Sequence, residues 1–345
     1  MRIGVLGAGS IGCYLGGRLL ASGVETLLVG RAALAAEVAA SGLSLSDYRG
    51  FRAHLAARRV AIATSPEPLA GCDVVLVTVK GGDTASAGDA LAGVVKTGAI
   101  VVSFQNGVQN PAALRAALPR NRVLAGMVPF NVLRSEGAAF HQGTSGRLAV
   151  ERTEDGAETP LVRALVAAGL PTRTHADMNA VLWGKLLVNL NNSINALAGV
   201  PLKEQLGARA YRRVMAACVR EGVAIVTEAG ISPVVDFPLP IRFLPAILSL
   251  PDPVFHAIAR SMVRIDPHAR SSMWDDLERG RSTEVDALNG EIVRLAARIG
   301  RVAPINASIL ARVKEAEGHR SPGLDAAALG AIIARAEEQA SARSR

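Results

Sequence analysis

The sequence predicts an α/β domain with a parallel sheet, followed by an all-α domain. Residues 1–31 have the pattern of a strand, a glycine turn, a helix and a second strand. Two further runs, 72–80 and 98–104, are rich in valine and almost continuously apolar, as expected for strands buried on both faces of a parallel sheet. From Asp177 onward, apolar residues recur at helical spacing instead.

This change of periodicity gives the domain organisation of the 345-residue chain, which is long enough for two hydrophobic cores. We expect the α/β domain at residues 1–175, the helical domain at 176–338 and a frayed tail at 339–345. With 50% hydrophobic and 20% charged residues, the composition is that of a folded soluble protein. Because the sequence lacks an apolar run of about 18 residues, we expect no membrane span.

The formal net charge of +8 is spread along the chain, and only 3% of the residues are aromatic. Nucleic-acid binding is therefore not expected, and an anionic cofactor and substrate account for the charge more simply. The three cysteines, Cys13, Cys72 and Cys218, are scattered and have no metal-ligand spacing. We expect no metal site, and the default location is a reducing cytoplasm.

The first glycine turn follows the opening strand directly, in the order that a dinucleotide-binding fingerprint requires. Gly7 allows the tight turn, Gly9 lets backbone N–H groups approach a pyrophosphate, and Gly12 lets the helix pack closely on the strand. The phosphates would lie at a helix N-terminus, which favours anions. The sequence thus predicts a Rossmann-like domain whose cofactor-binding turn consists of Gly7, Ala8, Gly9, Ser10, Ile11 and Gly12.

The end of the second strand indicates which dinucleotide is bound. An NAD site usually carries Asp or Glu about 20 residues beyond the turn, to hold the ribose 2′-hydroxyl. This chain has Arg31 at that point, and a guanidinium suits a 2′-phosphate. NADP(H) is therefore favoured over NAD; the alternative is that Arg31 is a solvated residue at a helix start.

Lys80 and Asn106 each follow a buried strand, at the sheet edge where ligands bind in open α/β folds. Lys80 could approach the cofactor phosphate or ribose, or could extend from the surface as a solvated lysine. Asn106 precedes Gly107, which permits close approach of a ligand, although an ordinary Asn-Gly turn would have the same sequence.

In the helical domain, Lys185, Asn189 and Asn192 fall on one helix face when 100° is counted per residue. Such a polar stripe is costly to bury without partners, so it is best explained as the wall of a wet cleft. Asn191 and Asn195 lie off the stripe, and capping or surface hydrogen bonding is their simpler role.

The rest of the helical domain gives three expectations. Residues 233–253 contain six prolines and should form an irregular connection with a short helix at most: Pro233, Pro238, Pro240, Pro245, Pro251 and Pro253. Ser271 or Ser272 can cap a helix that holds Asp275. Glu284 and Leu288 are one turn apart in a second helix running to Ile299.

Five segments in this order resemble the ketopantoate reductase (2-dehydropantoate 2-reductase) family across essentially the whole chain. They are GAGSIG with Arg31, VTVKGGDT, FQNG, WGKLLVN and RSSMWDDLERGRSTEVDALNG. The resemblance implies an N-terminal Rossmann domain, a helical C-terminal domain, and NADPH-dependent reduction of ketopantoate to pantoate in pantothenate biosynthesis.

Carried over residue by residue, the family's catalytic lysine matches Lys185, and its glutamate in the T-E-[IV]-D segment matches Glu284. The resemblance implies that Lys185 is the general acid that protonates the carbonyl oxygen as hydride arrives at C2. Glu284 would orient Lys185 and the nascent hydroxyl and would also contact the cofactor. On the cofactor side, the family's lysine and asparagine match Lys80 and Asn106.

The substrate carboxylate and hydroxyl would be held by Asn189, Asn192 and Ser272. Asn189 matches the family's asparagine one turn after the lysine, and Ser272 matches the serine of its SSM motif. A second asparagine, expected eight residues after the lysine, is replaced by Ser193, and Asn192 could substitute for it from the next position.

Two other functions fit the same sequence. One is reduction of another branched 2-oxo acid, suggested by Ser193 and the proline-rich stretch. The other is a non-catalytic NADP-binding sensor, since only the resemblance orients Lys185 toward Glu284. The apolar helical domain also suggests a homodimer.

Overall fold

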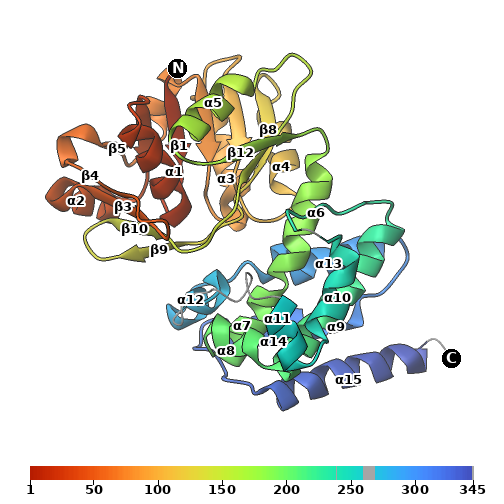
Figure 1. The fold of residues 1–345 in the computed structure, drawn as a ribbon. Coiled ribbons are helices and arrows are strands. Elements are labelled where there is room, and N and C mark those ends of the chain that lie inside the picture. Colours follow the sequence, from red (N-terminus) through yellow and green to blue (C-terminus); the bar gives the residue numbers. More distant parts are fainter. Residues whose placement is uncertain (238, 259–268, 344–345) are drawn as a thin grey trace. The chain divides into compact units, whose positions relative to one another are not determined.

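The computed structural model describes residues 1–237, 239–258 and 269–343. The chain forms two compact units, Met1–Met178 and Asn179–Arg345 (Figure 1). The division falls three residues after position 175, where the sequence places the boundary.

The first unit is built on an eight-stranded sheet in the order β12-β11-β8-β7-β6-β1-β2-β5 (Figure 1). Neighbouring strands are parallel except β8 and β11, which are antiparallel. The predicted α/β architecture with a mostly parallel sheet is confirmed. The strands are β1 (Ile3–Leu6), β2 (Thr26–Val29), β5 (Ala61–Ala63), β6 (Val74–Val77), β7 (Ile100–Ser103), β8 (Arg122–Met127), β11 (Leu148–Glu151) and β12 (Thr172–His175).

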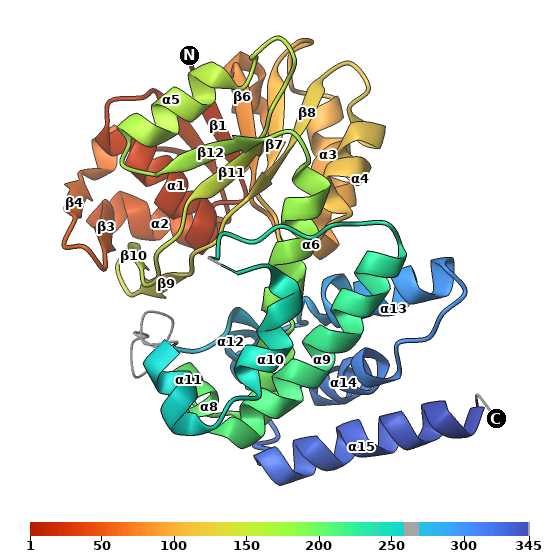
Figure 2. The same cartoon turned by 45° about the vertical axis from the view of Figure 1, so that its right-hand side comes forward.

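Helices cover both faces of this sheet, which explains why its central strands are apolar throughout (Figure 2). Val74 and Leu76 of β6 pack in one cluster with residues of α1 and α5, whereas Val75 and Val77 pack in a second cluster with residues of α3 and α4. The helices of this unit are α1 (Ser10–Ala21), α2 (Ala32–Ser41), α3 (Thr84–Ala92), α4 (Asn110–Ala117) and α5 (Thr159–Ala167).

A second, four-stranded sheet lies beside α1, in the order β4-β3-β10-β9. Its inner strands, β3 and β10, run parallel although about 90 residues separate them in the chain, with Leu45 opposite Phe140. The four strands are β3 (Leu43–Asp47), β4 (Arg52–Leu55), β9 (Val132–Ser135) and β10 (Ala139–Gln142).

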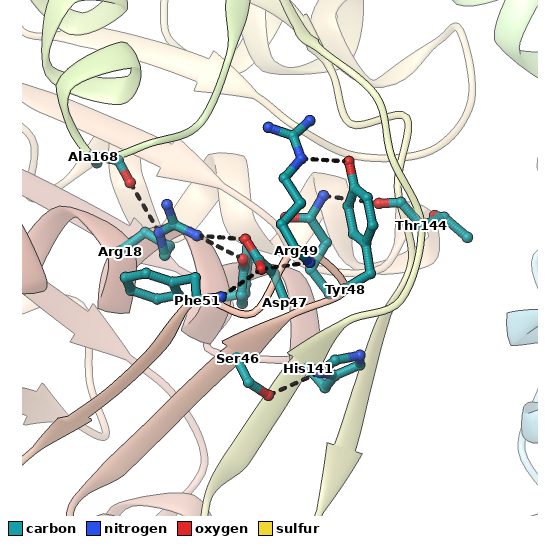
Figure 3. A network of polar contacts seen from close by, with 11 residues as sticks. Arg18, Ser46, Asp47, Tyr48, Arg49, Phe51, His141, Thr144 and Ala168 are labelled. Carbon is teal, nitrogen blue, oxygen red and sulfur yellow. Dashed lines mark hydrogen bonds and ion pairs between the residues drawn. The ribbon is translucent and has the colours of Figure 1, made fainter. Parts of the chain in front are cut away.

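Arg18 of α1 is 6% exposed and joins segments that are distant in the sequence (Figure 3). Its Nε donates to Ala168 O at 2.9 Å, and its Nη1 donates to the Tyr14 hydroxyl at 3.0 Å and to Asp47 Oδ2 at 3.4 Å. The guanidinium also lies 3.7 Å from the centroid of the Phe51 ring. A buried cation without partners is costly, so moving either acceptor away from Arg18 would be unfavourable. The contacts therefore hold β3 and the end of α5 against α1.

We expect Arg18→Met to lower the free energy of unfolding by about 3 kcal/mol, because it leaves the Asp47 carboxylate buried without its ion pair. Urea unfolding followed by circular dichroism measures the change. Arg49→Met is the matched control, since Arg49 is exposed and stacks on Tyr48; it should change stability by less than about 0.5 kcal/mol. Equal unfolding midpoints for the two variants would contradict the role given to Arg18.

The described residues of the second unit form helices joined by turns, as the periodicity predicts. The long helix α9 contacts α10, α13, α14 and α15 (Figure 1). The helices are α6 (Met178–Asn189), α7 (Asn191–Ala198), α8 (Leu202–Gly207), α9 (Arg209–Glu228), α10 (Leu244–Leu248), α11 (Asp252–Ile258), α12 (Ser272–Glu278), α13 (Asn289–Arg298), α14 (Pro304–Ala316) and α15 (Ala326–Arg343). Within the described ranges, no helix is long and apolar enough to span a membrane.

Two expectations about this unit are wrong in part. The proline-rich stretch contains a 3-10 turn at Ile241–Phe243, then α10 and α11, because Pro245 and Pro253 lie at helix starts where a missing N–H costs nothing. Pro238 lies outside the described residues. Helix α15 continues through residues 339–343, where the sequence predicts fraying, and residues 344–345 are also outside the described part.

Candidate active site

The glycine turn between β1 and α1 is closely packed at two of its three glycines. Gly7 has a φ of +100°, and a Cβ there would lie 2.6 Å from Val79 N. A Cβ at Gly12 would lie 2.4 Å from Gly7 O. At Gly9, by contrast, the nearest described atom that a Cβ would meet is Gly7 O, at 3.9 Å. Gly7 and Gly12 are thus required by packing, whereas Gly9 leaves space on its open side.

This open side fits a pyrophosphate. Helix α1 begins directly after Gly9, and the first N–H groups of a helix have no intrahelical acceptor. The first turn holds only neutral residues, so nothing opposes the positive end of the helix dipole. Thr78, which was not predicted from the sequence, donates from its hydroxyl to Gly7 O at 2.8 Å and so holds the turn in place. Its position directly after the valine run was the available signal.

Arg31 lies next to the same turn. It is exposed and precedes α2, and Gly30 before it abuts the turn so closely that a Cβ would lie 2.7 Å from Ala8 Cβ. The end of β2 therefore places Arg31 next in the chain to a residue that contacts the glycine turn, at the position where a dinucleotide-binding fold usually contacts the ribose.

Lys80 and Asn106 follow β6 and β7, which are adjacent in the sheet, with Val77 opposite Ser103. A network of side chains ties the two loops together. Thr84 Oγ1 donates to Gly81 O at 2.8 Å and accepts from Gln105 Nε2 at 2.7 Å. Asn110 Oδ1 lies 2.8 Å from the same hydroxyl and is the alternative acceptor for its single proton, and Asn110 Nδ2 donates to Asn106 O at 2.6 Å. The structure thus brings Lys80 and Asn106 to one sheet edge, and Thr84, Gln105 and Asn110 hold their loops there.

The polar stripe of the second unit spans two helices. Lys185 and Asn189 lie one turn apart on α6, and Asn192 lies on α7 beyond a break at Leu190. Burial lowers the pKa of the Lys185 amine from 10.5 to about 8. Asn189 is buried and Asn192 half-buried. This segment therefore combines a lysine that titrates near neutral pH with two amides.

Ser271 links α12 to this stripe. Its hydroxyl accepts from Trp274 N at 3.1 Å, which caps α12 as predicted, and it donates to Asn192 O at 3.2 Å. Ser272, the first residue of α12, is exposed beside this contact. The structure thus brings the segment of Ser272 to that of Asn192.

Glu284 is not in a helix, contrary to the prediction. It precedes a 3-10 turn, η5 (Val285–Ala287), and α13 starts only at Asn289. Thr283 donates two hydrogen bonds to Glu317, the C-cap residue of α14, and these bonds hold residues 283–285 in a turn.

Asn191 and Asn195 are buried, so the expected capping or surface role is wrong. Asn195 Nδ2 donates to Gln205 Oε1 at 2.8 Å, and Gln205 Nε2 donates to Asn191 Oδ1 at 2.7 Å. Asn195 Oδ1 also accepts from Ser271 N at 2.9 Å. These amides hold α7, α8 and the start of α12 together.

Ser193 is likewise part of the interior. It is fully buried, and its hydroxyl donates to Asn289 Oδ1. Asn289 Nδ2 donates to Asn306 Oδ1 at 3.0 Å, and Asn306 Nδ2 donates to Glu221 Oε2 at 2.8 Å. This polar chain crosses α7, α13, α14 and α9, and it engages the Ser193 hydroxyl within the protein.

Gly184, beside Lys185, is required by an extended segment that crosses α6. Val234 N donates to Ala180 O at 2.9 Å, one turn before Gly184. A Cβ at Gly184 would lie 1.9 Å from Val234 O and 3.1 Å from Val235 Cγ1. The backbone at Val234 thus covers the helix immediately before the lysine.

We expect Gly184→Ala to lower the free energy of unfolding by about 1–3 kcal/mol, because the added methyl group meets a backbone carbonyl that must move. Gly330→Ala is the control: Gly330 lies inside α15, and a Cβ there meets no described atom within 4 Å. That change should raise stability by about 0.5–1 kcal/mol through helix propensity. Urea titration of both variants tests the pair, and a stabilised Gly184→Ala protein would refute the close contact.

An α/β unit that opens with a dinucleotide-type glycine turn and is followed by a helical unit is typical of nicotinamide-dependent oxidoreductases. The model of the family described as ketopantoate reductase PanE/ApbA matches residues 3–155, and the model of its C-terminal domain matches residues 177–317. The chain belongs to the ketopantoate reductase family.

Individual relatives agree with this assignment. The chain is 31% identical over 327 residues to a 2-dehydropantoate 2-reductase of Halobacterium salinarum, covering 92% of this chain and 100% of the relative. A crystal structure of a PanE/ApbA family ketopantoate reductase from Ralstonia eutropha JMP134 is 29% identical, with a TM-score of 0.78 and coverage of 92% and 98%. A 2-dehydropantoate 2-reductase from Geobacter metallireducens shares the fold at 23% identity, with a TM-score of 0.77 and coverage of 92% and 100%.

Proposed function

We propose that this protein reduces ketopantoate to pantoate with NADPH. The observation that carries the proposal is Lys185, an amine with a pKa of about 8, on a helix that continues with Asn189 one turn later. An acid that titrates near the working pH transfers protons efficiently.

The residues of the first unit would hold the cofactor. Its pyrophosphate would bind at Gly9 and the start of α1, its 2′-phosphate at Arg31, and its ribose or phosphates near Lys80 and Asn106. NADPH, when bound, supplies the hydride that adds to C2 of the substrate.

The residues of the second unit would act on the substrate. Lys185 donates a proton to the carbonyl oxygen as negative charge builds there. Asn189, Asn192 and Ser272 hold the substrate carboxylate and hydroxyl, and Glu284 orients Lys185 and the new hydroxyl. Glu284 also contacts the cofactor in this proposal. We place the reaction in the cytoplasm and expect the enzyme to form a homodimer.

Another branched 2-oxo acid is the second candidate substrate. The burial of Ser193 favours it, because the hydroxyl at this position is engaged by Asn289. If Asn192 does not replace the missing amide, the pocket would hold the ketopantoate hydroxyl less firmly. A panel of branched 2-oxo acids ranks the candidates by kcat/KM.

Purified protein mixed with ketopantoate should oxidise NADPH in preference to NADH, as followed by absorbance of the reduced nicotinamide. We expect Lys185→Ala to lower kcat by about 10²- to 10⁴-fold, because the general acid is lost. The Kd for NADPH should not change. Unaltered turnover in this variant would overturn the role of Lys185, and no reduction of ketopantoate by the wild type would overturn the function.

The reduction should also depend on pH through Lys185. The protonated amine is the active form, and its pKa of about 8 lies below the ordinary 10.5, so the proton is lost at lower pH. We expect kcat/KM for ketopantoate to be level below pH 8 and to fall tenfold per pH unit above it. Oxidation of pantoate should rise through the same range. A reduction rate that stays level up to pH 10, with NADPH still bound, would contradict the assignment.

A further inference from the structure

The segment that carries Glu284 is fixed by a second glutamate. Glu317 Oε1 accepts two hydrogen bonds from Thr283, one from the backbone N–H and one from the hydroxyl, each 2.8 Å long. Thr283 Oγ1 in turn accepts from Val285 N at 3.3 Å. The residues immediately before and after Glu284 are thus both held in one chain of hydrogen bonds that ends on Glu317.

The C-terminal end of α14 also contacts the segment of Glu284 at Asp286, two residues later. Lys314, in the last turn of α14, pairs with Asp286 and donates to Glu317 Oε2 at 3.2 Å. Arg294 of α13 donates to Asp286 O at 2.7 Å. Both sides of Glu284 are therefore anchored to the two helices that pack around this turn.

The position of Glu317 is unfavourable for α14 itself. Glu317 is the C-cap residue of α14, and a negative charge at a helix C-terminus opposes the helix dipole. Burial alone would raise the pKa of its carboxyl, but the hydrogen bonds from Thr283 and Lys314 hold the pKa below its usual value. Glu315, two residues earlier, is exposed and pairs with Arg312 at 2.7 Å. The Glu317 carboxylate therefore stabilises the turn at 283–285 through its hydrogen bonds, whereas its charge destabilises the end of α14.

We propose that Glu317 is a positioning residue that acts through Thr283 to hold Glu284 in its working orientation. This inference rests on the proposed function, in which Glu284 orients the general acid. The backbone of Glu284 has φ −94° and ψ 21°, and the hydrogen bonds on either side keep it there. Without them, the segment is free to leave the turn, and the carboxylate of Glu284 moves with its backbone.

Glu317→Leu tests the proposal, because leucine has a similar size and accepts no hydrogen bond. We expect kcat for ketopantoate to fall by about 10- to 100-fold, as small misplacements of catalytic groups cost rates of this order. The Kd for NADPH should rise no more than it does in Glu284→Gln, because Glu284 is the cofactor contact that the change displaces. Glu317→Gln keeps the acceptor for Thr283 and should stay within about threefold of the wild type. Glu315→Leu, on the same helix, is the control for a general effect of removing a carboxylate.

Coupling to Glu284 separates positioning from a merely structural role. In a Glu284→Gln background, Glu317→Leu should lower kcat no further, since the group that it positions is already lost. Thr283→Val should reproduce the loss of kcat, and Thr283→Ser should restore it, which supplies the test from the other side of the contact should Glu317→Leu fold poorly.

The outcomes distinguish the two proposals. If the wild type does not reduce ketopantoate with NADPH, the proposed function fails. If the wild type is active and Glu284→Gln is impaired, but Glu317→Leu and Thr283→Val retain full kcat or act additively with Glu284→Gln, the positioning role is overturned.

Discussion

The close contact between the glycine turn at Gly7 and the residues that follow β6 is the constraint on which the proposed cofactor site of the first unit depends. The backbone of Gly7 lies so near Val79 that no side chain fits between them, and the Thr78 hydroxyl closes the contact on Gly7 O. Two parallel strands are thereby joined at their carboxyl ends, directly below the open side of Gly9. The start of α1, Arg31 after β2 and the loop of Lys80 after β6 all take their places from that junction.

The second unit depends on hydrogen bonds between polar groups in its interior. Its interior contains amides and a carboxylate that would be costly if unpaired, and three chains of hydrogen bonds satisfy them. One runs from Ser193 to Glu221, one joins Asn191, Gln205 and Asn195, and one links Glu317 to Thr283. The first two join different helices and the third joins the end of α14 to the turn at 283–285, so polar contacts help to fix the arrangement of elements around the apolar core.

The sequence predicted features that depend on local patterns. Strands buried on both faces appear as valine runs, a backbone with positive φ appears as a glycine, and helices appear as a 3.6-residue repeat. Each of these signals lies within a short stretch of sequence, so the sequence alone predicts the element. Other features depend on partners far along the chain. Asn195 is in the interior because it is hydrogen-bonded to Gln205 and Ser271, and the sequence alone does not show that these residues are its neighbours. Glu284 was predicted to be helical because its spacing from Leu288 fits a helix, but the hydrogen bonds between Thr283 and Glu317 hold its segment in a turn. Among the proposed site residues, the glycine turn, Arg31, Lys80, Asn106 and the polar stripe followed from local patterns, whereas Ser272, Glu284 and the catalytic role of Lys185 came only from the resemblance.

Arg18 has a consequence for how the α/β unit is made. Its Nε acceptor, Ala168, lies 150 positions later, and the parallel partner of β3 is supplied by β10. A ribosome-bound chain that ends before residue 168 would hold a guanidinium in its interior with an acceptor still missing. Arg18 and the β3–β10 pairing are thus contacts of large sequence separation, and the loop-closure entropy of such contacts must be overcome before they contribute stability.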